Sequence, residues 1–107
     1  MNQKNGKITQ VIWSEFAIEM LRQIYDYYQE TANQKVAQEL ISTIFSTTKQ
    51  LENYPHSGQI EENLAELSED HKYLVSGNYK IIYKEVKEGV LVTDIFDTRQ
   101  DPSKMQG

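Results

Sequence analysis

Two amphipathic segments joined by only a few polar residues constrain this chain more than any other feature. In residues 14–29, apolar side chains recur at the helical steps of three and four: Ala17, Met20, Leu21, Ile24, Tyr27 and Tyr28. A second stripe of this kind predicts a helix over residues 34–51. Ser14 and Asn33 stand where the N-caps of these helices belong. Because the link is short, we expect an antiparallel helical hairpin.

The last third of the chain has the alternation and the turn residues that are typical of strands. Residues 71–76, 79–86 and 90–96 are predicted strands, and the turns between them fall at residues 77–78 and 87–89. Turns of this length imply antiparallel pairing of neighbouring strands. Alternation on the middle strand places one apolar, aromatic face opposite a partly cationic face.

A further short strand is predicted at residues 8–12, where β-branched residues gather before the first helix. The acidic stretch 59–70 is expected to be a loop that contains a short helix around Leu64 and Leu67. The order of elements is then β-α-α-β-β-β. We expect a single α+β domain over residues 1–107, in which the helical hairpin packs on a small antiparallel sheet.

Charge is distributed unevenly over the chain, whose net charge is −5. Residues 52–70 hold six acidic and no basic side chains, whereas residues 71–107 hold six basic and five acidic ones. An acidic protein gains little from a phosphate backbone, so a nucleic-acid contact would need the cations of the last segment. The absence of cysteine excludes disulfides and a cysteine nucleophile. No apolar run is long enough to span a membrane, and we expect a soluble, cytoplasmic protein.

Four stretches of the sequence resemble toxins of the ParE/RelE superfamily, and its ParE-like branch in particular. They are Tyr54-Pro55-His56-Ser57-Gly58, Tyr73-Leu74-Val75, the run from Gly77 to Tyr83, and the run from Ile95 to Pro102. The helix start at Trp13-Ser14 is also similar, so the resemblance covers almost the whole chain. It implies a small α+β toxin of a bacterial type II toxin–antitoxin system, which a cognate antitoxin neutralises.

The resemblance leaves three functions open. ParE-like toxins of plasmid-stabilisation modules inhibit DNA gyrase, and RelE-like toxins are endoribonucleases that cleave mRNA on the ribosome. A third alternative is a degenerate, non-toxic module that still binds its antitoxin. The resemblance to ParE is closer, chiefly through the loop at residues 54–58 and the ending at residues 97–100. We therefore expect a gyrase inhibitor that performs no chemistry of its own.

The residues available for RNA cleavage are consistent with this preference. Attack by a 2′-hydroxyl needs a base, cations that stabilise the phosphorane, and an acid for the leaving oxygen. By resemblance to RelE-like nucleases, Lys80 and Arg99 lie at or near positions where those relatives carry arginine. The Tyr or His that follows the second arginine in those relatives is missing from residues 100–107. The set is depleted, and no residue is assigned a catalytic role.

No metal or cofactor is predicted. His56 and His71 are the only histidines, and their spacing does not form a metal site. Both are expected to face solvent. The five glycines are scattered, so no glycine-rich loop cradles a phosphate.

Three cations are predicted to form a toxic, anion-binding surface: Lys80, Lys84 and Arg99. The two lysines project from the same face of one strand. Arg99 follows the adjacent strand and reaches them if the chain bends over the end of the sheet. A structural role for all three is hard to supply from the sequence. The alternative for Arg99 is an ion pair with Asp97 or Asp101.

The first helix carries the candidate antitoxin groove, which consists of Tyr25, Tyr27 and Tyr28. These three side chains cannot all face one core in a helix with 3.6 residues per turn. Some of them should remain exposed, and exposed aromatic surface often marks an interaction site. The expected partners are thus an antitoxin protein and DNA gyrase, or the ribosome if the chain is a nuclease.

Overall fold

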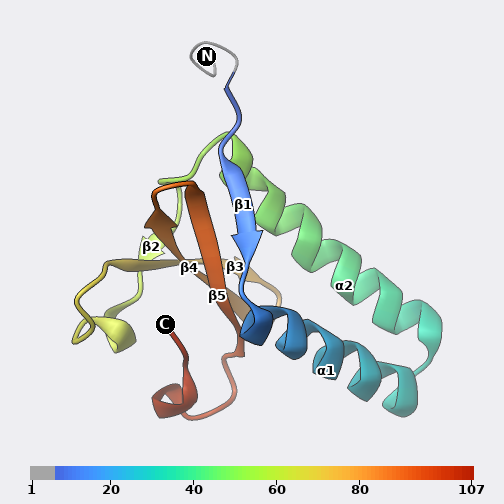
Figure 1. The fold of residues 1–107 in the computed structure, drawn as a ribbon. Coiled ribbons are helices and arrows are strands. Elements are labelled where there is room, and N and C mark those ends of the chain that lie inside the picture. The colour runs from blue at the N-terminus through green and yellow to red at the C-terminus, as the bar shows by residue number, and fades with distance from the viewer. Residues whose placement is uncertain (1–6) are drawn as a thin grey trace.

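A five-stranded sheet carries a helical hairpin on one face (Figure 1). The computed structural model describes residues 7–107. The strands lie in the order β1-β5-β4-β3-β2. The helices and strands are α1 (Glu15–Thr31), α2 (Gln34–Lys49), β1 (Gln10–Trp13), β2 (Gln59–Ile60), β3 (His71–Ser76), β4 (Tyr79–Val86) and β5 (Gly89–Asp97).

The two helices begin where the capping residues of the sequence place them. The Ser14 hydroxyl accepts a hydrogen bond from the Ala17 N–H at 3.0 Å, and the Asn33 side chain accepts one from the Val36 N–H at 2.8 Å. Each cap satisfies a backbone donor that the helix itself leaves free. Helix α2 stops at Lys49, and a 3-10 segment, Gln50–Glu52, completes the length that the apolar stripe predicts.

The predicted α+β fold class is confirmed, but the sheet is mixed and not antiparallel throughout. Strand β1 pairs in parallel with β5, from Gln10 opposite Gly89 to Trp13 opposite Val92. The other pairs are antiparallel, as expected. The chain passes from β1 directly into α1, so no short turn joins β1 to another strand. The local sequence therefore does not determine whether β1 runs parallel or antiparallel to its neighbour. The acidic stretch also contributes a two-residue edge strand, β2, that the sequence pattern did not indicate.

Two apolar clusters lie on opposite faces of the sheet. The larger one fills the space beneath the helices and consists of Ala17, Leu21, Ile44, Leu51, Leu74, Tyr79, Ile81, Tyr83, Val90, Val92 and Ile95. The smaller one lies on the other face and consists of Leu64, Ile82, Phe96 and Met105, with Tyr73 against it. The predicted aromatic face of β4 is therefore the helix-side face, because Tyr79, Ile81 and Tyr83 all belong to the larger cluster.

An irregularity in β5 changes which face its last residues present. Ile82 lies opposite Asp94 and Tyr83 lies opposite Val92, so Thr93 is an extra residue in β5. Such a bulge shifts the alternation of side chains by one position. As a result, Ile95 packs beneath the helices while Phe96 belongs to the smaller cluster.

Gly58 lies where two parts of the fold approach too closely for a side chain. Its N–H donates to the Tyr83 hydroxyl at 2.9 Å. A Cβ at this position would lie 2.5 Å from that hydroxyl and 2.8 Å from the carbonyl oxygen of Tyr73. The close approach accounts for the glycine that ends the Tyr54–Gly58 stretch.

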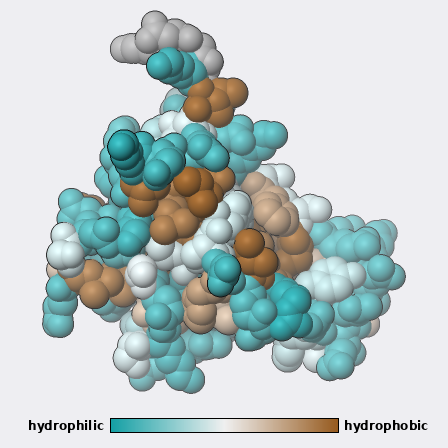
Figure 2. All heavy atoms as spheres, in the orientation of Figure 1, coloured by the Kyte–Doolittle hydropathy of each residue, from teal (hydrophilic) through white to brown (hydrophobic). Residues whose placement is uncertain are grey.

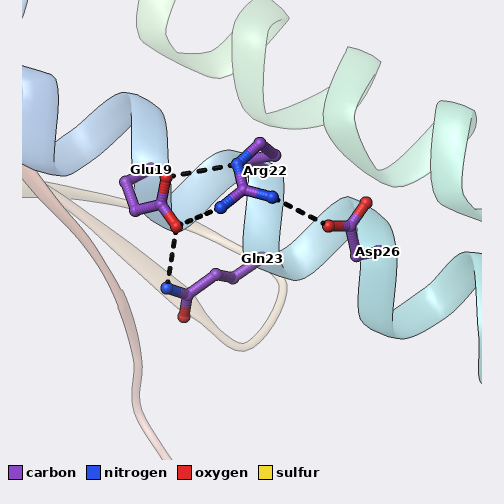
Figure 3. Close-up of polar contacts among 4 residues, drawn as sticks. All are labelled: Glu19, Arg22, Gln23 and Asp26. Atoms are coloured by element: carbon purple, nitrogen blue, oxygen red, sulfur yellow. Dashed lines mark hydrogen bonds and ion pairs between the residues drawn. The ribbon is translucent and has the colours of Figure 1, made fainter.

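The solvent-facing side of α1 carries a network of charged and polar side chains (Figure 3). Arg22 forms ion pairs with Glu19 and with Asp26, the latter at 3.2 Å, and Gln23 donates to Glu19 at 3.1 Å. These side chains stand three or four residues apart, which brings them together on one helical face. The network neutralises Arg22 within the helix.

Candidate functional site

A groove lies between α1 and the C-terminal end of β5, and its volume is about 530 Å³. From α1 it is lined by Phe16, Met20, Gln23, Ile24, Tyr27 and Tyr28. From the sheet and the segment after β5 it is lined by Tyr79, Asp94, Ile95, Phe96, Asp97, Arg99, Gln100 and Lys104. Figure 2 shows hydrophobic side chains at the surface beside the start of α1, with hydrophilic ones around them. The groove thus combines an apolar helix wall with a charged opposite wall.

Arg99 lies at this groove and is held by Asp97. The Nε of Arg99 donates to Oδ1 of Asp97 at 2.9 Å, and its Nη2 donates to Oδ2 at 2.8 Å. The Arg99 backbone N–H also donates to Oδ1, at 2.9 Å. This arrangement holds the pKa of Asp97 below its usual range and raises the pKa of Arg99. The Arg99 side chain nevertheless remains 55% exposed, so part of the guanidinium is free to meet a partner.

Two tyrosines complete the surroundings of Arg99. Tyr28 and Tyr79 line the groove together with Arg99, and Tyr79 lies directly opposite Asp97 across β4 and β5. The neighbouring Arg99, and then Tyr79, hold the pKa of Tyr28 below its usual range. Burial, followed by the neighbouring Tyr28, raises the pKa of Tyr79.

Asp94 is a buried carboxylate that the sequence did not single out. Its side chain accepts a hydrogen bond from the Gln106 N–H at 2.8 Å. The hydroxyl of Thr93 donates to the Gln106 carbonyl at 3.3 Å. Together they hold the chain end against the sheet, where Met105 is buried. Burial raises the pKa of Asp94 to about 6, against an ordinary value of 3.8.

Comparison with known proteins gives the family of the chain. Residues 11–102 match the model of the family described as ParE toxin of type II toxin-antitoxin system, parDE. The chain belongs to the ParE toxin family. The match extends from β1 to the segment after β5 and includes all the residues that hold Arg99. Membership in this family implies an antitoxin partner.

A solved structure shows the same fold. The chain is similar to one from a structure described as "Chromosomal ParDE TA system from P. aeruginosa", with a TM-score of 0.71 and 16% sequence identity. The similarity covers 83% of this chain and 95% of that chain. At this identity the likeness establishes the architecture alone. No curated protein is similar enough to this ParE family member to count as a match.

The structure does not bring Lys80 and Lys84 together with Arg99. Lys80 forms an ion pair with Glu61 at 2.8 Å and lies over the ring of Tyr73, 4.2 Å from its centroid. Lys84 forms an ion pair with Glu69 at 2.6 Å. Lys80 projects from the face of β4 opposite to Tyr79, whereas Arg99 lines the groove beside α1 together with Tyr28 and Tyr79. The expectation that these three cations lack structural roles was wrong, because each has a carboxylate partner.

The three tyrosines predicted to form the antitoxin groove occupy different positions. Tyr27 and Tyr28 line the groove, and their rings meet edge to face at 5.1 Å between centroids. Tyr27 is 59% exposed. Tyr25 is half-buried and does not line the groove. Sequence reasoning also missed Phe16, whose position one turn before Met20 on the apolar side of α1 was a usable signal.

The histidines lie away from the groove. His56 is exposed, as expected, and its Nδ1 lies 2.7 Å from Oε2 of Glu85 on the surface. His71 is buried, contrary to expectation, because the chain end packs over it and Gly107 lies beside its ring. Over residues 7–107, no group of histidine and carboxylate side chains is arranged to hold a metal ion. In the same range, no helix is long and apolar enough to cross a membrane.

Proposed function

We propose that this chain is the toxin of a plasmid-stabilisation module, that it inhibits DNA gyrase by binding, and that its antitoxin neutralises it by covering the groove beside α1. The protein acts in the bacterial cytoplasm, where gyrase is found. The observation that carries the proposal is Arg99, which is held rigidly yet half-exposed at the mouth of an apolar groove.

The helix wall of the groove suits a protein partner. Phe16 is 41% exposed and Tyr27 is more exposed still, although both are large and apolar. Met20 and Ile24 continue the same wall. Aromatic and methionine side chains are enriched where proteins meet, because they provide contact area at a low entropic cost. An amphipathic segment of an antitoxin would cover this wall and remove it from water.

The charged wall is better suited to binding than to RNA cleavage. A phosphorane needs an excess of positive charge around it. At this site Asp97 already neutralises Arg99, and the remaining charged lining residues, Asp94 and Lys104, have opposite signs, so there is no excess of positive charge. Lys80 and Lys84 are likewise neutralised by carboxylates, on another part of the surface. No histidine lies among the residues that line the groove. These features support an inhibitor that acts by contact.

Purified protein assayed against DNA gyrase tests the proposal. We expect inhibition of supercoiling, and in cells filamentation and a DNA-damage response with bulk mRNA intact. Arg99→Ala should abolish growth inhibition while antitoxin binding is nearly unchanged. Arg22→Ala is the matched control, because Arg22 is also a half-exposed arginine paired with acids, but on the solvent side of α1.

Other outcomes would indicate other functions. Rapid ribosome-dependent cleavage of mRNA would establish an endoribonuclease and overturn the gyrase proposal. A chain that binds the product of the neighbouring gene without inhibiting growth would be a non-toxic antitoxin-binding module. If the chain is recovered as a monomer that does not bind the product of the neighbouring gene, the proposal that the groove binds an antitoxin is wrong.

A further inference from the structure

One edge of the sheet is left open at β1. Strand β1 pairs with β5 on one side, and within residues 7–107 no strand pairs with its other side (Figure 1). Its four residues, Gln10–Trp13, include no charged side chain and no proline. Natural sheets often protect an exposed edge with such residues, because an unprotected edge pairs readily with another chain. The sequence of β1 therefore does not oppose the addition of a further strand.

Two backbone N–H groups of β1 point out of the sheet. The Ser14 N–H donates inward, to a carbonyl of β5 at 3.0 Å, and in a parallel ladder every second residue bonds to the same neighbour. The residues in between, Val11 and Trp13, therefore direct their N–H and carbonyl groups outward. The Thr9 N–H also points outward, and it is already bonded to the Glu52 carbonyl at 2.8 Å. The open part of the edge thus begins at Val11.

Apolar side chains flank this edge on both faces of the sheet. On the helix side, Val11 and Trp13 line a hollow of about 300 Å³ together with Phe45, which is 48% exposed. The rings of Trp13 and Phe45 lie 5.2 Å apart between centroids. On the other face Ile12 lies beside Leu91, and neither of these two belongs to the clusters that cover the sheet. Figure 2 shows hydrophobic side chains at the surface over β1 and β5, so an added strand would be packed from both sides.

Unlike charges stand at the two ends of β1. Lys7 precedes the strand, and Glu15 follows it as the first residue of α1. Both are exposed, and within residues 7–107 neither side chain has a hydrogen bond or an ion pair. A second β1 that runs antiparallel to the first brings the start of each strand to the end of the other. That direction places unlike charges together, whereas a parallel copy would place like charges together.

We propose that two copies of this chain associate through β1, antiparallel about a two-fold axis at Ile12, and form one continuous sheet. In this register Val11 of each copy exchanges backbone hydrogen bonds with Trp13 of the other, and the two Ile12 side chains face each other. Lys7 of each copy then approaches Glu15 of the other. The hollow at this edge and the groove beside α1 share no lining residue, so the dimer leaves both grooves open to a partner.

Sedimentation velocity of the full chain measures the association, which does not depend on the proposed function. The net charge of −5 on each copy opposes association, so we expect a weak dimer with a dissociation constant on the order of 100 µM. Trp13 is the only tryptophan, and its fluorescence should shift to shorter wavelength as the dimer buries it. In hydrogen-exchange NMR, the amides of Val11 and Trp13 should exchange more slowly at high protein concentration.

Ile12→Lys tests the register, because it places two like charges against each other at the two-fold axis. We expect it to raise the dissociation constant by about a hundredfold. Leu91→Lys is the matched control, since Leu91 lies beside Ile12 on the same face and is also half-buried, but belongs to β5, one strand inside the edge. This control should leave the dissociation constant nearly unchanged. Thermal unfolding confirms that both variants are folded.

The charges at the strand ends provide a second test, which also decides the matter if Ile12→Lys does not fold. Lys7→Glu and Glu15→Lys should each weaken the dimer by about tenfold, because each turns two ion pairs into two repulsive pairs. The double variant should restore the parent affinity. Glu15→Lys is the sharper of the two, since it lowers the net negative charge, and a general effect of charge would strengthen the dimer instead.

Three results would overturn the proposal. The first is a protein that stays monomeric at every concentration. The second is a dimer that Ile12→Lys does not weaken, or that Leu91→Lys weakens equally. The third is protection of the Val11 and Trp13 amides only when the product of the neighbouring gene is added, because the edge would then take a strand of that partner and not a second copy of this chain.

Discussion

Replacement of Lys80 by methionine should destabilise the fold, because it leaves the carboxylate of Glu61 buried without its cation. The Glu61 side chain is 1% exposed and that of Lys80 is 21% exposed, and their ion pair measures 2.8 Å. Asn63 donates two further hydrogen bonds to Glu61, at 3.0 and 2.9 Å. Removal of one partner from a buried pair costs about 3–5 kcal/mol. Since Lys80 keeps some solvent contact, the lower end applies, and we expect a loss of about 3 kcal/mol.

The measurement is chemical unfolding followed by circular dichroism at pH 7. Lys80→Met retains the apolar stem of the lysine, so packing against Tyr73 is largely kept. The double variant with Glu61→Gln removes the unpaired charge and should recover most of the loss, which would leave a deficit of about 1 kcal/mol.

The pH dependence provides an independent check of the same reasoning. Burial raises the pKa of Glu61, but the hydrogen bonds from Lys80 and Asn63 together hold it below its usual value of 4.5. The pair therefore stabilises the protein above that pH, and its contribution is lost as the pH falls through the lowered pKa. Without Lys80, burial raises the pKa of Glu61, so the unpaired carboxylate takes up a proton at a higher pH than in the parent protein, and the deficit of Lys80→Met should shrink as the pH falls from 7 to 4. If Lys80→Met unfolds within about 0.5 kcal/mol of the parent protein, the ion pair is not structural, and Lys80 is available for the function that the sequence suggested.

Two other substitutions test features around the site. In the folded parent protein the pKa of Asp94 is about 6, against an ordinary value of 3.8, so only the folded state keeps the proton between these two pH values. The stability of the parent protein should therefore decrease by about 2–3 kcal/mol from pH 4 to pH 6. Asp94→Asn should remove this pH dependence. Thermal melts across this range would show a parallel slope for both proteins if the argument is wrong. Gly58→Ala should lower the free energy of unfolding by about 2 kcal/mol or more, because its Cβ would collide with the Tyr83 hydroxyl. Gly77→Ala has open space around its Cβ but a φ of +59°, and should lower it by about 1 kcal/mol. Equal losses in a denaturant titration would contradict the collision.

Local signals in the sequence predicted most of the secondary structure. Ser14 and Asn33 marked the helix starts because capping depends only on the next three residues. Gly77 marked the hairpin turn because its positive φ is a property of the turn itself. The parallel pairing of β1 was not predictable in this way, since it depends on how the whole hairpin packs against the sheet.

The candidate site was predicted only in part, for a related reason. The ion pair of Arg99 with Asp97 was one of the alternatives, because the two residues are near neighbours. The partner of Lys80 is Glu61, and no pattern in the acidic stretch distinguishes that carboxylate from Glu62 beside it. The groove that Tyr28 and Arg99 both line lies between the first helix and the end of the last strand, so it exists only after the fold has formed.

The extra residue at Thr93 has a consequence for how relatives of this chain should be aligned. The residues before it and the residues after it in β5 follow opposite rules for which positions are apolar, because one inserted residue exchanges odd and even positions. A homologue without this insertion keeps its later residues in step with this chain once a one-residue gap is placed at Thr93, and its counterpart of Asp94 still lies on the face of Ile82, away from the helices. An alignment of such a homologue without the gap would show the apolar pattern exchanged from Asp94 onward, and that exchange would mark an alignment misplaced by one residue.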